Sequence, residues 1–388
     1  METATFSQVF AVKEFKVLFA SFALMIVGDG VKMLALSVLV YTSTGSAGLS
    51  ATAYMAGWLP YIFGGMFLLS LADRLPSRAL MVTGEVVRVV VCLLLAFGGL
   101  PVWAMLALVL VSGLFAPVFG AARSAMLPEV LPGDAFVLAR SLMGVVSASS
   151  QVAAMAVGGT FLALTGPSGA LAVTAGLSAV AAFVLRYGLP YSRARGEKRH
   201  GAVRSTLRVN GRLFTDTRVR TLLLAQWVPP MCLAGAEAMI VPYLGGTGQA
   251  GLVLASAAIG MAIGEFVVGR FVSPATRERL SLPIAVCMGA PWLAFVFMPG
   301  LGVAAVLAAL AASGLSYGLG LQRRFLEAIP EDVRGQGYGL LSAGLMTGQA
   351  VGAALIGGLG ELAGPHVAIA VSGAVGMIMG AVLLSRVR

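Results

Sequence analysis

Long apolar segments recur along almost the whole chain, and they restrict what it can fold into. The segment from Ala51 to Leu69, for example, contains no charged residue. The hydrocarbon of a bilayer offers no partners for backbone N–H and C=O groups, whereas a helix satisfies these groups internally. Each such segment is therefore predicted to cross a membrane as a helix.

The composition excludes a soluble globular protein. Hydrophobic residues make up 59% of the 388 positions and charged residues only 11%, whereas about a quarter of a soluble domain is charged. The mean hydropathy is +0.94. The net charge of +10 does not indicate nucleic-acid binding, because no soluble stretch is long enough to present a basic face.

Apolar runs bounded by charged residues, Gly or Pro predict twelve spans. The predicted fold class is all-α integral membrane, with twelve transmembrane helices in two pseudo-symmetric six-helix bundles. The spans cover residues 15–41, 50–70, 79–98, 101–122, 136–164, 168–189, 219–244, 248–271, 280–299, 302–322, 335–360 and 365–385.

Lys and Arg set the predicted orientation. Lys32, Arg88 and Arg140 lie inside predicted spans, and all the others lie at the termini, in the even-numbered loops or at the span ends beside them. Positively charged loops stay on the cytoplasmic side. We therefore expect cytoplasmic termini in a multi-pass protein of a bacterial inner (plasma) membrane, with the first span retained rather than cleaved as a signal.

Residues 190–218 form a basic connector between residues 1–189 and 219–388. We expect it to lie against anionic lipid headgroups, with an amphipathic interfacial helix near Ser205 to Leu213. The flanking parts are related, because a shift of 198 positions superposes identical residues, and each is predicted to be a six-helix bundle. The matched pairs are Pro132 and Pro330, Asp134 and Asp332, Leu142 and Leu340, Gln151 and Gln349, Gly166 and Gly364, and Pro167 and Pro365.

The charged loop between the second and third predicted spans reads LADRLPSRAL from Leu71 to Leu80. Its Asp73, Arg74 and Arg78 resemble the signature G-x-x-x-D-R-x-G-R-R of the major facilitator superfamily of transporters. The positions where this signature has Gly, Gly and Arg are occupied by Leu69, Pro76 and Ser77. The resemblance implies that Asp73 faces the positive N-terminal end of span 11 and helps to close an inner gate, with Arg74 and Arg78 at the headgroups.

A longer segment, Phe115 to Leu142, is similar to the branch of this superfamily that includes enterobactin exporters and macrolide efflux proteins. Arg140 replaces the usual Asn of that branch. The resemblance implies a substrate site between the two bundles near the middle of the membrane, alternating access, and export. The matching residues are Pro117, Arg123, Leu127, Pro128, Pro132, Ser141 and Leu142.

The chain departs from the proton antiporters of this superfamily in two places. The antiporter signature of span 5 survives only as Gly158 and Gly159, with Ala154 and Met155 at its Gly and Pro positions. Span 4 is expected to lack the embedded arginine of many such antiporters. A coupling carboxylate is therefore sought in other spans.

Asp29 is predicted to lie about 20 Å into the first span, near the middle of the bilayer. An ionisable group there is expensive and indicates a function or a partner. Lys32 follows at i+3 on nearly the same helix face. The pair is either a static ion pair inside the bundle or a titrating, cation-binding site in which Lys32 tunes the proton affinity of Asp29.

Span 7 offers a counterpart in the second bundle. Pro229 and Pro230 remove two backbone donors and are predicted to kink or interrupt the helix near a binding region. Glu237 follows about two turns later, and either faces a central cavity or makes a local hydrogen bond. Gln226 and Trp227 are candidates to line the same cavity, with ordinary packing as the alternative.

Two further patterns have both a functional and a structural interpretation. Glu85 and Arg88 in span 3 are spaced i, i+3 nearer the cytoplasmic end, and we expect a gate or packing pair. Gly344, Gly348 and Gly352 recur at every fourth position of span 11. This stripe is either a smooth surface between moving bundles or simple close packing.

Together these features predict a secondary transporter that exports a small amphipathic organic compound, drug-, macrolide- or siderophore-like, by proton antiport. Asp29 and Glu237 favour a cationic or basic substrate. Proton-coupled uptake and a non-transporting receptor or scaffold are the alternatives. We expect no enzyme activity, metal or cofactor, because no span carries paired His or Asp at metal-ligand spacing. A monomer is expected, with substrate, protons and lipid as its only partners.

Overall fold

The computed structural model describes residues 4–44, 59–191, 201–245 and 247–386. Every regular element in these ranges is a helix, which confirms the all-α prediction. The elements up to the connector are α1 (Phe6–Ala11), α2 (Lys13–Thr44), α4 (Leu59–Phe67), α5 (Leu71–Arg74), α6 (Ser77–Phe97), α7 (Val102–Gly113), α8 (Ala116–Val130), α9 (Asp134–Gly188) and α10 (Ala202–Thr215). The later elements are α11 (Thr217–Ala238), α12 (Ile240–Leu244), α13 (Thr247–Phe271), α14 (Pro274–Leu293), η1 (Ala294–Phe297), α15 (Leu301–Ser313), η2 (Gly314–Leu321), α16 (Gln322–Ala328), η3 (Glu331–Val333), α17 (Arg334–Ala363) and α18 (Pro365–Ser385).

Ten helices in the described ranges are long and apolar enough to cross a membrane. The expected span at residues 50–70 reaches into positions outside the described ranges, and α4 is its described part. The expected span at 136–164 forms the first part of α9. The side chains of the antiporter-signature positions, 154–159, lie outside what the structure describes. The arrangement is consistent with the predicted fold of twelve helices.

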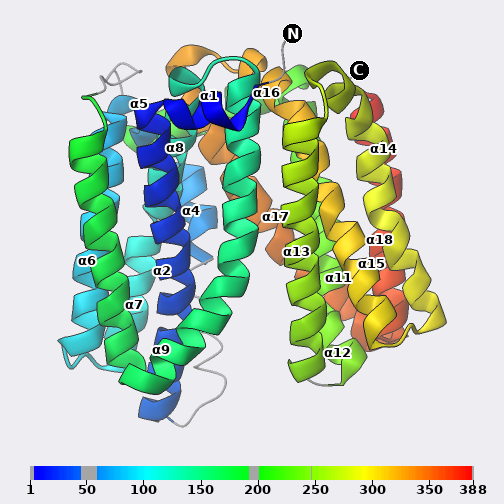
Figure 1. Cartoon of the computed structure of the whole chain (residues 1–388), viewed down its shortest axis with the longest axis horizontal. Coiled ribbons are helices and arrows are strands. Elements are labelled where there is room, and N and C mark those ends of the chain that lie inside the picture. Colours follow the sequence, from blue (N-terminus) through cyan, green and yellow to red (C-terminus); the bar gives the residue numbers. More distant parts are fainter. Residues whose placement is uncertain (1–3, 45–58, 192–200, 246, 387–388) are drawn as a thin grey trace.

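The long element α9 contains two predicted spans and reverses direction between them (Figure 1). Inside it, Gly166 has φ of 69° and ψ of 179°. Glycine adopts a positive φ at little cost because it has no Cβ. Pro167 follows and begins the returning helix, as proline favours the first turn. The reversal falls where the sequence places the boundary between spans 5 and 6.

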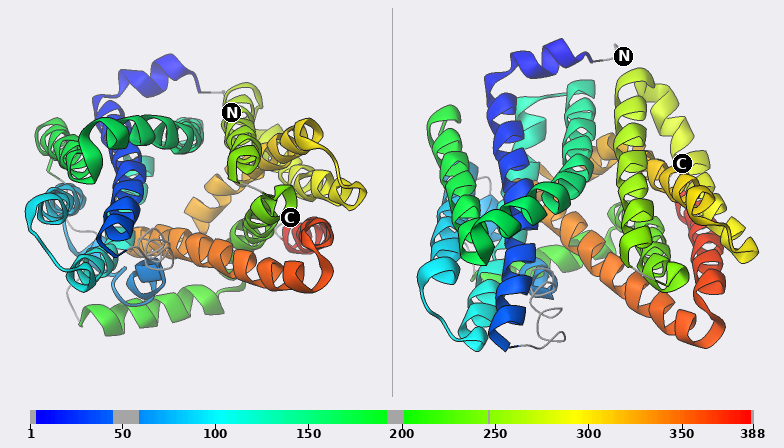
Figure 2. Two further views of the ribbon diagram at one scale, coloured as in Figure 1. Left: turned by 90° about the horizontal axis from the view of Figure 1, so that it is seen from below. Right: turned by 60° about the horizontal axis from the view of Figure 1, so that its bottom comes forward.

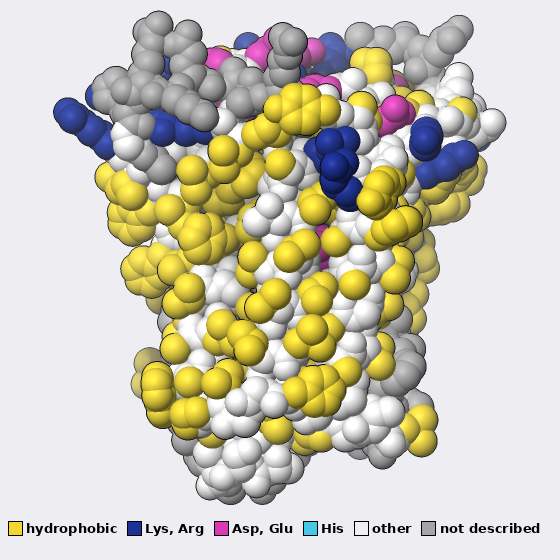
Figure 3. Space-filling model, turned by 90° about the vertical axis from the view of Figure 1, so that its left-hand side faces the viewer, with side chains coloured by type: hydrophobic (Ala, Val, Ile, Leu, Met, Phe, Trp, Pro, Cys, Tyr) yellow, Lys and Arg dark blue, Asp and Glu magenta, His cyan; other side chains and the backbone are white. Residues whose placement is uncertain are grey.

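The helices lie in two groups, which we call the first half (α1–α9) and the second half (α11–α18) (Figure 1). Both chain ends lie at the same end of the molecule. Figure 3 shows Lys and Arg side chains gathered at this end, above a broad band of hydrophobic side chains. We call it the basic end. The hydrophobic band is the surface expected to face lipid.

The glycine stripe of α17 packs inside the second half. A Cβ placed on Gly344 would overlap the Trp227 ring, and one on Gly352 would overlap the backbone carbonyl of Met231, both on α11. Gly348, between them, also faces Met231. The stripe therefore brings α17 and α11 close together, which favours close packing over a sliding surface between the halves.

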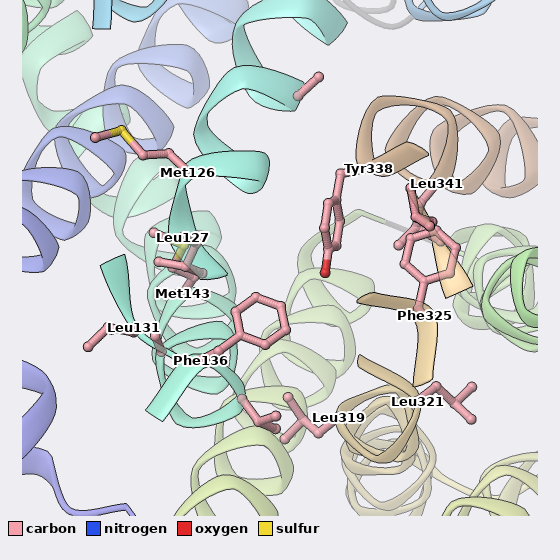
Figure 4. Packing of buried hydrophobic residues seen from close by; sticks show 14 of the residues in the cluster. Met126, Leu127, Leu131, Phe136, Met143, Leu319, Leu321, Phe325, Tyr338 and Leu341 are labelled. Atoms are coloured by element: carbon pink, nitrogen blue, oxygen red, sulfur yellow. The ribbon is translucent and has the colours of Figure 1, made fainter. Parts of the chain in front are cut away.

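The two halves meet at the basic end through a buried apolar layer (Figure 4). Phe136 of α9 lies edge-on to Tyr338 of α17, with ring centroids 6.4 Å apart, and Tyr338 lies 5.4 Å from Phe325 of α16. All three side chains are buried. The molecule is therefore closed at the basic end.

Candidate functional site

Four charged side chains from α2 and α6 form one network inside the first half. Lys32 Nζ donates to Asp29 Oδ1 at 2.8 Å, and Arg88 Nη2 lies 3.3 Å from Asp29 Oδ2. Arg88 Nη1 also lies 3.4 Å from Glu85 Oε2. The sequence predicted two separate pairs at different depths, whereas Arg88 joins them. Glu85 and Arg88 thus belong with Asp29 rather than with the gate.

Arg123 of α8 completes this network and corrects an expectation. Its Nη2 lies 3.9 Å from Glu85 Oε1, its Nη1 donates to Met25 Sδ at 3.1 Å, and its guanidinium carbon lies 5.5 Å from the centre of the Phe22 ring. The hydropathy pattern predicts an end of span 4 at residue 122. The spanning stretch instead continues from Val102 to Val130, so this span carries a buried arginine.

We call Asp29, Lys32, Glu85, Arg88 and Arg123 the charged cluster. It holds three basic and two acidic side chains, and pairing makes their burial tolerable. The Asp29 side chain is 33% exposed and that of Glu85 only 4%. Asp29 is therefore the more exposed carboxylate of the charged cluster. Among the residues that the structure describes, no group of three His, Cys, Asp or Glu is placed to hold a metal ion.

Glu237 is the isolated acid of the second half. It is half-buried on α11, and within the described ranges its carboxylate has neither a hydrogen-bond nor an ion-pair partner. The helix runs unbroken from Thr217 to Ala238, so Pro229 and Pro230 do not interrupt it. A half-buried carboxylate without a partner favours binding a proton or a positively charged group.

Gln226 and Trp227 make contacts within the second half. Gln226 is buried, donates to the Leu222 carbonyl at 3.2 Å and accepts from Gln322 Nε2 at 3.2 Å. Trp227 Nε1 donates to the Leu341 carbonyl of α17 at 2.8 Å. These contacts favour the packing alternative for both residues. We therefore leave them out of the proposed binding site.

At the basic end, Asp73 joins the two halves by capping α17. Its Oδ1 accepts from Gly335 N and its Oδ2 from Gln336 N, both at 2.7 Å, and the side chain is buried. The first N–H groups of a helix have no intrahelical partner and carry partial positive charge, so a carboxylate is favoured there. We call this the Asp73 contact. It has the geometry that the family resemblance implied.

A second connection between the halves was not predicted. Arg277 Nη1 of α14 donates to Asp134 Oδ1 of α9 at 2.7 Å, with side chains only 3% and 8% exposed. Arg277 also donates to the carbonyls of Val268, Gly269 and Val272 at the end of α13. One guanidinium thus caps the C-terminal end of α13 and holds the N-terminal end of α9.

The two arginines of the charged loop were expected at lipid headgroups. Arg78 Nη1 instead donates to the Leu189 carbonyl just beyond α9 at 2.9 Å, and its guanidinium carbon lies 5.8 Å from the centre of the Tyr191 ring. Arg74 is half-buried and also has an interaction partner. Arg78 therefore ties the loop to the end of the first half.

Replacing Gly335 by Ala is expected to break the Asp73 contact. A Cβ there would lie 2.5 Å from Asp73 Oδ1 and 3.0 Å from Cγ, so the carboxylate must leave the two amides. Losing a hydrogen bond to a charged group costs about 1.5–3 kcal/mol, which is roughly 10- to 100-fold in the ratio of closed to open molecules. Spin-label distances across the basic end measure this ratio. Gly358→Ala on the same helix, where a Cβ meets nothing within 4 Å, is the control and should match wild type.

A family model described as Major Facilitator Superfamily matches residues 18–322. No curated protein sequence matches the chain. The chain has 14% identity and a TM-score of 0.75 with a bacterial homologue of the iron transporter ferroportin in its outward-facing state, over 96% of this chain and 98% of that one. With the human organic anion transporter MFSD10 it has 13% identity and a TM-score of 0.76, over 96% of this chain and 99% of that one. With the fucose:proton symporter of E. coli it has 16% identity and a TM-score of 0.71, over 95% of this chain and 98% of that one.

These solved structures are those of a homologue of an iron transporter, an organic anion transporter and a fucose:proton symporter, so their likeness to this chain shows the fold and does not select a substrate. The enterobactin and macrolide branch is not distinguished by them. The family model, in contrast, covers most of the chain, including the helices that carry the charged cluster and the Asp73 loop. The chain belongs to the Major Facilitator Superfamily of membrane transporters.

Proposed function

We propose that the protein exports a small amphipathic organic compound in exchange for protons, by alternating access. The charged cluster is the observation that carries this proposal, because Asp29 is one-third exposed while it binds Lys32 and Arg88. Protonation of Asp29 would free Lys32 and leave Arg88 to Glu85. One proton thereby changes the charge and the contacts between α2 and α6, as coupling to a conformational change requires.

Glu237 supplies the complementary feature in the second half. Because Lys32 and Arg88 already neutralise Asp29, selection for a basic or cationic substrate rests mainly on Glu237. A substrate that lies between the halves would contact the apolar helix faces with its hydrophobic part and Glu237 with its positive group. Amphipathic organic cations fit this combination.

The proposed direction follows from orientation and resemblance. Positively charged loops favour a cytoplasmic location of the basic end, as in a bacterial inner membrane. The described conformation, closed at the basic end, would then face outward after release of substrate. Export itself rests on the similarity of Phe115 to Leu142 to exporters, and proton-coupled uptake is the alternative.

A transport assay in vesicles of known protein orientation tests the proposal. Ligands selected by thermal shift of the purified protein are loaded on either side, and flux is followed with and without a pH gradient. Export predicts flux from the side of the basic end, driven by protons that move the opposite way. Proton-driven flux in the same direction as protons indicates uptake. The absence of any proton-dependent flux, with ligand binding intact, supports the receptor alternative instead.

Replacing Glu237 by Gln is expected to weaken binding of a cationic ligand by roughly 10- to 100-fold, because a charge-assisted contact of about 1.5–3 kcal/mol is lost. Binding of an uncharged analogue should change little. Isothermal titration with both ligands measures the difference. Glu361→Gln, at an exposed acid of α17, is the matched control. An equal loss for both ligands would indicate that Glu237 has only a structural role.

A further inference from the structure

The connector helix α10 has an inner face that binds both halves at the Asp73 contact. Toward the first half, Ser70 N donates to Thr206 Oγ1 at 3.0 Å. Toward the second half, Gln336 Nε2 donates to the Thr206 carbonyl and to Asn210 Oδ1, each at 2.8 Å. Thr206 and Asn210 are both buried. The backbone amide of the same Gln336 donates to Asp73. The hydrogen bonds between α10 and Gln336 therefore support the Asp73 contact from outside the bundle.

The outer face of α10 carries two rows of exposed side chains. Arg204, Arg208 and Arg212 recur at every fourth residue and are exposed, which places them on one stripe of the helix. Val203 and Leu207, each 47% exposed, form an apolar row beside it. A helix with a basic row next to an apolar row is suited to the membrane interface. Figure 2 shows α10, in green, lying crosswise to the spans and beside α17, as an interfacial helix does.

The position of α10 indicates which anion fits these rows. Asn210 Nδ2 donates to the Gly65 carbonyl of α4 at 3.4 Å. The exposed Phe63 and Met66 on the same helix α4 present large apolar side chains outward, as expected of a surface that contacts acyl chains. A soluble anion would contact the exposed arginines, of which Arg208 also interacts within the chain, and would leave the apolar row in water. A phospholipid with an anionic headgroup satisfies both rows.

We propose that α10 binds anionic phospholipid and that this binding stabilises the closed basic end. The inner face of α10 bridges the halves only while Gln336 lies against Thr206 and Asn210. A lipid that holds α10 in the interface therefore favours the conformation in which these bonds exist. The protein would open its basic end less readily in a membrane rich in anionic lipid. This effect does not depend on the substrate or on the direction of transport.

The test uses the full chain in vesicles of phosphatidylcholine with or without phosphatidylglycerol. Spin labels on Lys16→Cys of α2 and Glu327→Cys of α16, two exposed positions at the basic end of different halves, report the closed fraction. Exposed Cys287 is first replaced by Ser. Phosphatidylglycerol is expected to raise the ratio of closed to open molecules about tenfold, because each arginine near the surface adds to the attraction.

Replacing Arg204, Arg208 and Arg212 by Gln should reduce this response to less than about twofold. The same substitution at Arg186, Arg279 and Arg386, three exposed arginines elsewhere, removes equal charge and should preserve the tenfold response. Gln336→Leu, which removes both hydrogen bonds from this side chain to α10, should retain bound phosphatidylglycerol, counted by native mass spectrometry, while the closed fraction no longer responds. A full response in the α10 arginine variant overturns the proposal. So does an equal response to soluble glycerol phosphate in phosphatidylcholine vesicles.

Discussion

Replacing Asp29 by Asn is expected to reduce proton-driven transport by at least about 100-fold. The Asp29 carboxylate lies 2.8 Å from Lys32 Nζ and 3.3 Å from Arg88 Nη2. Asn keeps the size of the side chain, but it neither takes up a proton nor balances these two cations. The charged cluster would then lack its exposed carboxylate, and a pH gradient would lose the group that we propose couples it to transport. Substrate flux under an imposed pH gradient measures the loss.

Exchange of labelled for unlabelled substrate without a gradient separates coupling from binding. Asp29→Asn should keep this exchange within about threefold of wild type, since exchange requires substrate binding but no net proton movement. Asp332→Asn, at an exposed acid near the start of α17, is the matched control and should retain gradient-driven flux. Wild-type flux in the Asp29 variant would place the coupling proton on another group.

Replacing Arg277 by Gln is expected to shift the basic end toward the open conformation by at least about 100-fold. The substitution leaves the Asp134 carboxylate, only 8% exposed, without the guanidinium at 2.7 Å. Breaking a buried pair by removing one partner costs about 3–5 kcal/mol. This cost falls on the closed conformation, because separation of the halves lets water reach Asp134.

The spin-label pair at residues 16 and 327 measures this shift. Arg279→Gln, on the exposed side of the same helix, is the control and should leave the distance distribution unchanged. Adding Asp134→Asn to Arg277→Gln removes the unpaired charge and should restore much of the closed population. If Arg277→Gln alone leaves the distances as in wild type, the ion pair does not determine closure.

Hydropathy predicted the helices of this protein well because a membrane-spanning segment must satisfy its own backbone hydrogen bonds. The reversal at Gly166 and Pro167 is predictable for a related reason, since the Gly–Pro pair has a conformational preference of its own. Charge was a less reliable guide to span ends. The charge of Arg123 predicts a span end at residue 122, although small residues continue on both sides of this arginine. A buried partner such as Glu85 makes such an arginine possible, and that partner lies on another helix.

Contacts between helices could be predicted from the sequence only where a known motif includes one of the contacting residues. The charged loop pointed to the Asp73 contact through its resemblance to the superfamily. The ion pair between Arg277 and Asp134 was only weakly indicated by the sequence. A shift of about 200 positions places Ser273 opposite Asp73, so the loop of the second half that corresponds to the charged loop lacks its carboxylate. The structure shows that Asp134 of the first half supplies a carboxylate to Arg277 of the second half. Neither spacing nor periodicity specifies a partner so distant in sequence.

The close packing of α11 against α17 has a consequence for how the second half moves. With the Trp227 ring against Gly344 and the Met231 carbonyl against Gly352, neither helix can slide or rotate past the other without a steric clash. We therefore expect the pair to tilt as a single rigid body. If a ligand binds Glu237 as proposed, a tilt of α11 would also move the N-terminus of α17, so that occupancy near one end of the pair would change the geometry at the other.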